Sequence, residues 1–299
     1  MKKDTSLLLI SATLLIVASF SYLYEQRYTD LIPVITYPYR DYALPLAVLG
    51  AFTLVFTLYL RLREKETFYP AFSSPISNLV FFIVMGIIMK VAAEILHEVG
   101  GHGFYVLLFG GRILKVHISL LWPLQFSYIW WSLPAGNPLE TALVFGGGIL
   151  NSIIISFVLQ FLLFFRPQRW RLGVPLLWLA YWSYISSAGY LLSGGFSAFG
   201  DVRELIRMGF LTNLSSFLLG LAVFIAGYPF LSLILRRLLT PLVAVNNLKY
   251  AVAAFWLTTA LVAILTALNP DIRTPFIVIP MGLIPSPLWL VSELLWKRI

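Results

Sequence analysis

The chain has 299 residues, of which 60% are hydrophobic and only 11% charged, whereas soluble domains are usually about a quarter charged. These proportions exclude an ordinary soluble domain. The net charge of +8 does not indicate nucleic acid as a partner, because the basic residues stand in small groups beside apolar segments and not along one stripe. Cysteine is absent, so disulfides and thiolate ligands are excluded and any metal must be bound through nitrogen and oxygen.

Long apolar stretches recur along the whole chain between short polar breaks. About 20 predominantly apolar residues are enough for a helix to cross a bilayer. The predicted spans are Leu7–Leu23, Tyr42–Leu60, Ile76–Phe109, Leu139–Phe165, Val174–Leu192, Leu214–Leu235 and Tyr250–Leu268, with a proline-broken eighth at Pro275–Leu295. The first stretch lacks a small-residue cleavage site, so we expect a retained span and not a signal peptide. The sequence therefore predicts an all-α, multi-pass integral protein of the cell membrane, with seven or eight transmembrane helices surrounded by the lipid bilayer.

The third predicted span is unusual because it carries ionisable residues, namely Lys90, Glu94, His97, Glu98 and His102. Such groups cost a few kcal/mol or more inside a membrane, so they are usually partnered and usually functional. His97, Glu98 and His102 are close to the His-Glu-x-x-His pattern, in which two histidines one helical turn apart bind zinc and the glutamate acts on water. We interpret this group as a metal-dependent hydrolase site.

The spacing of the two histidines departs from that pattern by one residue. In a regular α-helix, an offset of five residues turns the second imidazole roughly 140° away from the first. A π-bulge adds one residue to a turn, and Gly100–Gly101 have no Cβ to oppose it. We therefore predict a bulge that brings His97 and His102 onto one face. The alternative is that the two histidines and the glutamate only cross-link neighbouring helices by hydrogen bonds.

The composition changes after the third span. Between Gly110 and Pro138 the chain is rich in Gly, Pro, Trp and β-branched residues. This mixture predicts strands or a re-entrant segment, and its aromatic residues suit the membrane interface.

Three segments together resemble the site-2 protease family of intramembrane zinc metalloproteases. Glu94–Gly111 is similar to the family's metal-binding helix, which runs His-Glu-x-x-His and ends in an apolar stretch closed by glycine. Phe145–Asn151 resembles its glycine-rich motif ending in Asn, and Gly194–Asp201 falls where its Asn-Pro-Asp-Gly motif supplies an aspartate ligand. The resemblance covers about Ile76–Met208. It departs in the extra residue of the histidine motif, in the missing proline after the first motif glycine, and in Gly-Asp-Val in place of Asn-Pro-Asp-Gly.

The resemblance implies a function and a set of roles. Zn²⁺ would be bound by His97, His102 and Asp201, Glu98 would be the catalytic proton carrier, and Asn151 would hold the unwound backbone of the substrate. The substrate would be a membrane protein or membrane peptide. The chain would then divide into two N-terminal transmembrane helices (1–68), a metalloprotease-like membrane core (69–208) and C-terminal transmembrane helices (209–299).

The residues by themselves leave alternatives for these roles. His117, in the segment after the third span, is the other candidate for third ligand, and Asp201 would then be a loop acid balancing Arg203. Asn151 is equally suited to an interhelical hydrogen bond.

A different class of function is also compatible with the third span. A non-proteolytic membrane protein, either a transporter or a chaperone-like protein, would use Glu94, Glu98 and His97 as a polar or ion path. Such a protein would not need stoichiometric metal.

Two signals disagree about orientation. Most of the Lys and Arg residues lie on one side if the spans alternate, which favours a cytoplasmic N-terminus and places His97 and His102 nearer the outer face. The family resemblance implies a site approached from the cytoplasm, and we follow the resemblance.

Overall fold

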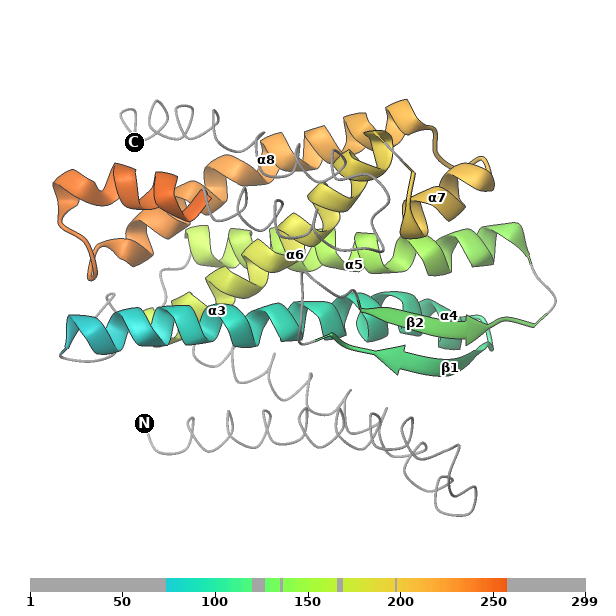
Figure 1. The fold of residues 1–299 in the computed structure, drawn as a ribbon, viewed down its shortest axis with the longest axis horizontal. Helices are drawn as coiled ribbons and strands as arrows, with labels where there is room; N and C mark the ends of the chain where they lie inside the picture. The colour runs from blue at the N-terminus through green and yellow to red at the C-terminus, as the bar shows by residue number, and fades with distance from the viewer. Residues whose placement is uncertain (1–73, 120–126, 135–136, 166–168, 197, 257–299) are drawn as a thin grey trace, which may run out of the picture. The chain divides into compact units, whose positions relative to one another are not determined.

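The structure is a computed structural model that describes residues 74–119, 127–134, 137–165, 169–196 and 198–256 (Figure 1). Apart from Lys115–His117, all of these residues belong to one compact unit, which is made of Thr67–Leu114 and Ile118–Ile299. The predicted N-terminal part (1–68), the spans expected within it, the span at Pro275–Leu295 and part of the span at Tyr250–Leu268 lie outside the described residues.

The described residues are mostly helical, with one small sheet. The helical elements are α3 (Pro75–His97), η1 (Glu98–Gly103), α4 (Phe104–Leu108), α5 (Pro138–Phe165), α6 (Trp170–Phe196), α7 (Gly200–Arg207), α8 (Asn213–Leu239) and η2 (Val245–Asn247). Residues 248–256 are also helical. The strands β1 (Arg112–His117) and β2 (Tyr128–Ser132) form a two-stranded sheet and run in opposite directions in Figure 1. The expected strand segment after the third span is thus present as a hairpin-like sheet.

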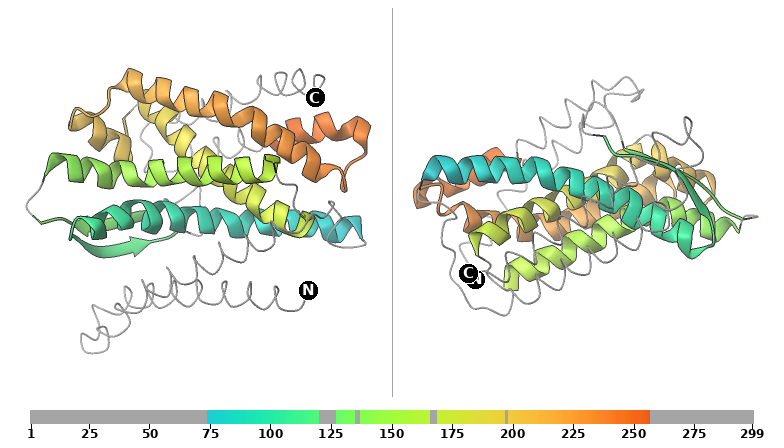
Figure 2. Two further views of the ribbon diagram at one scale, coloured as in Figure 1. Left: turned by 180° about the vertical axis from the view of Figure 1, so that it is seen from behind. Right: turned by 90° about the horizontal axis from the view of Figure 1, so that it is seen from below.

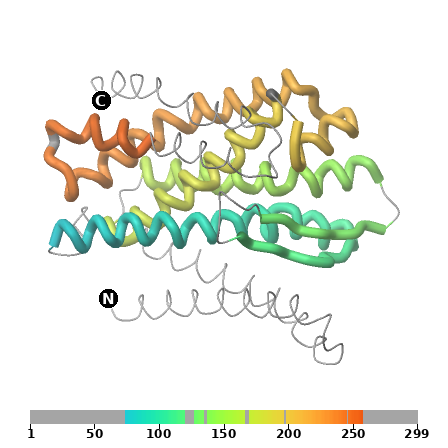
Figure 3. Tube along the Cα trace, in the orientation of Figure 1, coloured from blue at the N-terminus to red at the C-terminus, as the bar shows by residue number. Residues whose placement is uncertain are grey.

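Three helical runs among the described residues are long and apolar enough to cross a membrane, so the chain is a membrane protein. They are Pro75–Leu108, Pro138–Phe165 and Asn213–Leu239. They coincide with the predicted third, fourth and sixth spans. The first of them continues from α3 through η1 into α4, as the unbroken tube in Figure 3 shows.

Helix α6 covers the predicted fifth span but is not one of these three runs. It packs against α3, α5 and α8, so protein and not lipid covers most of its surface. Tyr181, Tyr184, Ser183 and Ser187 are all buried within it. A helix surrounded by other helices does not need a uniformly apolar surface, which explains why hydropathy describes this span poorly.

Helix α3 has two contrasting sides. Ile76, Ile83 and Ile87 are exposed, whereas Asn78 and Lys90 are buried. Soluble proteins rarely expose a long contiguous apolar surface. A bilayer covers such a stripe without cost, so the exposed side of α3 is the side that suits lipid.

Side-chain hydrogen bonds fix α3 against α6. The indole nitrogens of Trp178 and Trp182 donate to the backbone carbonyls of Phe82 and Gly86, each at 2.8 Å. A Cβ on Gly86 would lie 2.9 Å from the Trp178 ring, so glycine permits this approach. Because lipid offers no competing hydrogen bonds, such contacts set the register of one helix on the next.

Helix α5 runs alongside α4, η1 and the C-terminal part of α3 (Figure 2) and contacts all three elements. It also contacts α7. Helix α5 is therefore placed to orient side chains that project from η1 and from α7.

Candidate metal centre

The third span changes from α to π geometry at the histidine motif. Element η1 is a π-helix over Glu98–Gly103, and α-helix resumes at Phe104. The extra residue of the π turn compensates for the five-residue spacing, and the ring centroids of His97 and His102 lie 5.0 Å apart. The predicted bulge is confirmed.

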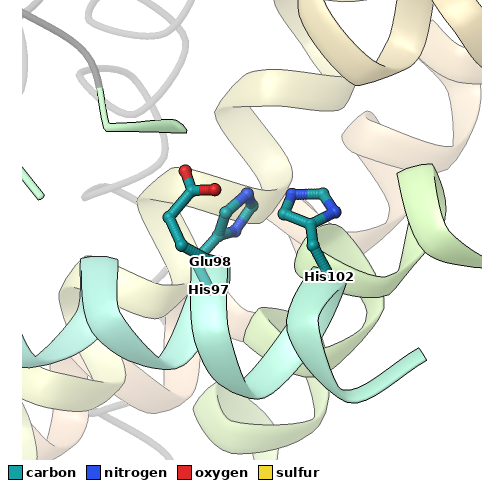
Figure 4. A group of neighbouring side chains, drawn as sticks. All are labelled: His97, Glu98 and His102. Atoms are coloured by element: carbon teal, nitrogen blue, oxygen red, sulfur yellow. The ribbon is translucent and has the colours of Figure 1, made fainter. Parts of the chain in front are cut away.

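His97, Glu98 and His102 come together on one side of this helix, as Figure 4 shows. Each offers one ligand atom, and these atoms lie within 4.8 Å of one another. All three side chains are buried. The group is therefore close enough to hold a metal ion.

Residues of α5 orient both imidazole rings through hydrogen bonds to their Nδ1 atoms. Nδ1 of His102 lies 2.7 Å from the carbonyl oxygen of Val144. A carbonyl only accepts, so Nδ1 carries a proton, and in the neutral form of this imidazole Nε2 is the nitrogen with the lone pair. Nδ1 of His97 lies 3.0 Å from the hydroxyl of Ser152. Hydrogen bonds of this kind at the second ring nitrogen are the usual support of metal-binding histidines.

Glycines let α5 approach the histidines closely. A Cβ on Gly148 would lie 2.6 Å from Nε2 of His97 and would also clash with Nε2 of His102. A Cβ on Gly101 would lie 2.8 Å from the carbonyl oxygen of Gly147. The two Nε2 atoms thus converge over Gly148, and the glycine-rich stretch after Phe145 leaves the space that they need.

Asp201 of α7 lies beside His102, although it is not one of the three clustered residues. Its Oδ2 lies 3.3 Å from Nε2 of His102. Bonds of about 2.0–2.2 Å to a tetrahedral zinc ion place two of its ligand atoms about 3.3–3.6 Å apart. Burial raises the pKa of the Asp201 carboxyl, but the neighbouring His102 outweighs it, so this pKa lies below its ordinary value. The separation of 3.3 Å is that of an ion pair or hydrogen bond between Asp201 and His102, and it also fits two ligands of one ion.

The donor atoms suit zinc. Two neutral imidazole nitrogens and one carboxylate oxygen form a set that catalytic zinc sites use, and no soft sulfur ligand is required. The orientation of His102 by Val144 and the space above Gly148 are the features of this chain that fit a bound ion.

The other residues singled out in the sequence take different places. His117 lies on β1 and is not part of the group of ligand atoms formed by the described residues. The side-chain nitrogen of Asn151 donates to the carbonyl of Leu96 at 2.6 Å, which is the interhelical bond that its alternative interpretation predicts.

Lys90, which is buried, and Glu94, which is half-buried, form an ion pair one to two turns before His97. Lys90 also lines a groove of about 580 Å³ whose walls are otherwise almost entirely apolar, including Phe82, Trp178 and Phe255. This groove does not include the three clustered residues of the histidine motif.

Sequence reasoning missed Val144, Ser152 and Tyr190, and it placed Gly148 in the glycine-rich motif without a role toward the histidines. Val144, Gly148 and Ser152 follow one another at four-residue intervals, and residues so spaced share one face of a helix. That four-residue periodicity could have predicted which face of α5 lies against the two histidines. Tyr190 of α6, which contacts Asp201, had no comparable signal.

Comparisons of the chain with protein-family models, with curated proteins and with solved structures gave no match in any of the three. The geometry of the site therefore carries the assignment of function.

Proposed function

We propose that this chain is a zinc-dependent membrane endopeptidase, similar to the site-2 proteases, that hydrolyses transmembrane or membrane-proximal peptide segments. One observation carries the proposal. His97, Glu98 and His102 cluster on a helix that is apolar enough to cross a membrane, and the Asp201 carboxylate of α7 lies 3.3 Å from Nε2 of His102.

The proposed zinc ligands are His97, His102 and Asp201. Three protein ligands leave a position open, which distinguishes catalytic from structural zinc. When bound, the ion supplies a Lewis acid that activates water near neutral pH and polarises a carbonyl group.

Residues of the chain would supply proton transfer, orientation of the ligands and exclusion of bulk water. Glu98 would accept the proton of the attacking water and deliver it to the amine nitrogen as the peptide bond breaks. Val144 and Ser152 would hold the imidazoles in the orientation that bonding requires. The buried position of His97, Glu98 and His102 would keep bulk water away from the reacting bond.

The small sheet suggests how a substrate would be presented. Strand β2 contacts η1, and a Cβ on Gly103 of η1 would meet Ile113 and Ile129, one from each strand. An extended peptide can pair with the edge of a sheet through backbone hydrogen bonds. We propose that the sheet lies at membrane depth and that an unwound substrate pairs there. Asn151 would contact it through its amide oxygen or the second hydrogen of its amide nitrogen, because the first hydrogen is donated to Leu96.

The same proposal includes the wider topology. The predicted spans beyond the three apolar runs would bring the total to seven or eight transmembrane helices, in a multi-pass protein of the cell membrane. The metalloprotease-like core would occupy 69–208.

A second candidate function follows from the Lys90–Glu94 pair. A largely buried ion pair beside an apolar groove is what a transporter or chaperone-like protein would use, with Glu94, Glu98 and His97 as the polar path. That function predicts no stoichiometric zinc and no cleavage.

Cleavage by purified protein in liposomes tests the proposal. We expect the wild type to cut at least one member of a panel of single-span membrane substrates, and cleavage to be abolished by Glu98→Gln or by removal of zinc. Glu140→Gln, the same change at the start of α5, is the matched control and should retain cleavage. Absence of cleavage across the panel by zinc-loaded wild type would favour the second candidate, and cleavage that survives Glu98→Gln would exclude the role of Glu98.

A further inference from the structure

Tyr190 lies between two of the proposed ligands. Its hydroxyl oxygen accepts a hydrogen bond from the backbone N–H of Asp201 at 3.3 Å. Its ring centroid lies 6.4 Å from that of His97. The phenol of α6 therefore borders the metal centre without belonging to the ligand set.

Among the described residues, no group accepts a hydrogen bond from the hydroxyl of Tyr190. A phenol can donate one hydrogen bond as well as accept. Within the part of the chain that the structure describes, the bond from Asp201 is the one hydrogen bond of this hydroxyl, and there it is the acceptor. This donor bordering the metal centre has no acceptor within the described ranges, so it is available to a bound substrate.

The position of this hydroxyl is fixed by its surroundings. The Tyr190 ring packs on Phe199 with centroids 4.7 Å apart and on the buried cluster that includes Leu191 and Val202. The chain passes it at Gly200, which has a φ of +50°, and a Cβ there would collide with the hydroxyl itself. A donor held in place before the reaction needs no reorganisation, which is what makes such donors effective in catalysis.

We propose that the Tyr190 hydroxyl donates a hydrogen bond to the carbonyl oxygen of the scissile peptide bond as that oxygen becomes anionic. This inference rests on the proposed hydrolase function. The water oxygen forms a bond to the carbonyl carbon, and the carbonyl π electrons move to the oxygen that Tyr190 contacts. When they return, the C–N bond breaks, and the amine leaves with the proton that Glu98 took from the water. Tyr190 keeps its proton throughout.

The test compares Tyr190→Phe with Tyr184→Phe. Tyr184 is a matched control because it also lies on α6, and its substitution by Phe also removes a buried hydrogen bond, which its hydroxyl donates to the carbonyl of Phe224. Removing one oxyanion donor typically lowers kcat by about 10²–10³-fold. We expect that loss in Tyr190→Phe, with KM and zinc content close to wild type, and wild-type kcat per folded molecule in Tyr184→Phe.

A binding measurement supplies a readout independent of turnover. A phosphinic peptide with the sequence of a cleaved substrate has tetrahedral oxygens in place of the reacting carbonyl. Its affinity for zinc-loaded protein should fall at least tenfold in Tyr190→Phe and stay unchanged in Tyr184→Phe. Unchanged kcat and unchanged phosphinate affinity would overturn the inference while leaving the Glu98-dependent function intact. Loss of zinc from Tyr190→Phe would also overturn it, because Tyr190 would then act by positioning Asp201. If the wild type cleaves no substrate, the proposed function fails and this inference fails with it.

Discussion

Oδ2 of Asp201 and Nε2 of His102 lie 3.3 Å apart, although one residue is on α7 and the other in the π-helix of the third span. No local sequence pattern joins these two elements. The helix α5 does so, because it contacts both η1 and α7. The separation fits an ion pair as well as two atoms bound to one ion, and it is this closeness to His102 that makes Asp201 the better candidate than His117 for third ligand.

Removing Asp201 should weaken metal binding strongly. Changes to groups that only support a ligand typically cost 10- to 100-fold in affinity, so loss of a ligand should cost more than tenfold. We expect this from Asp201→Ala in a competition titration of zinc against a chelator, and no change from His117→Ala. The reverse result would assign the third ligand to His117.

Substituting either histidine should remove the metal, whereas substituting the glutamate should not. We expect about one zinc per chain in wild type and in Glu98→Gln, and none after His97→Ala or His102→Ala, because the imidazoles are proposed ligands and Glu98 is not. Elemental analysis of purified protein measures this directly. Zinc that survived both histidine changes would exclude the site, and wild type free of zinc would favour the ion-path function.

Local patterns predicted the parts of this molecule that depend on neighbouring residues in the chain. Hydropathy predicted the runs at Pro75–Leu108, Pro138–Phe165 and Asn213–Leu239, and the glycines after Glu98 predicted the π turn. Helix α6 fits hydropathy less well because its neighbours, and not lipid, surround it.

Contacts between elements were harder to predict. Val144 takes part in the site through its backbone carbonyl, a group that every residue has, so its side chain carries no signal. Tyr190 reaches Asp201 through the packing of α6 on α7. Such residues depend on the three-dimensional path of the chain, which a single sequence does not reveal.

The π turn makes an unusual prediction for a deletion. Deleting Gly100 shortens the offset between the two histidines from five residues to four, which suits an ordinary α turn with both imidazoles on one face. Gly100→Val instead adds a branched side chain whose Cβ would lie 3.1 Å from the Asn151 amide. We expect the deletion to retain more zinc than Gly100→Val. Equal loss in both would show that the π geometry itself is required.

Labelling of single cysteines tests the direction of access. Arg112 is exposed at the end of the sheet near η1, and Arg171 is exposed beyond the far end of α5. If α5 crosses the bilayer, the two must lie on opposite sides. The resemblance predicts that an impermeant thiol reagent reaches Arg112→Cys from the cytoplasm and Arg171→Cys from outside. The absence of native cysteine makes the signal unambiguous, and the opposite pattern would support the charge distribution.

The two motif glycines Gly146 and Gly148 provide a sharp test of the metal centre, because the same substitution has different surroundings at each. A Cβ on Gly148 would fall on the Nε2 atoms of both histidines, whereas a Cβ on Gly146 would meet only Leu205, at 4.0 Å. Both positions are in α5, so the gain in helix propensity from alanine is the same, about 1 kcal/mol. We expect Gly148→Ala to lower zinc affinity more than tenfold and abolish Glu98-dependent cleavage, and Gly146→Ala to change neither. Thermal unfolding of the zinc-free proteins should show both variants folded. Wild-type zinc affinity in Gly148→Ala would mean that the imidazoles do not converge over this glycine, and the proposed ligand geometry would be wrong.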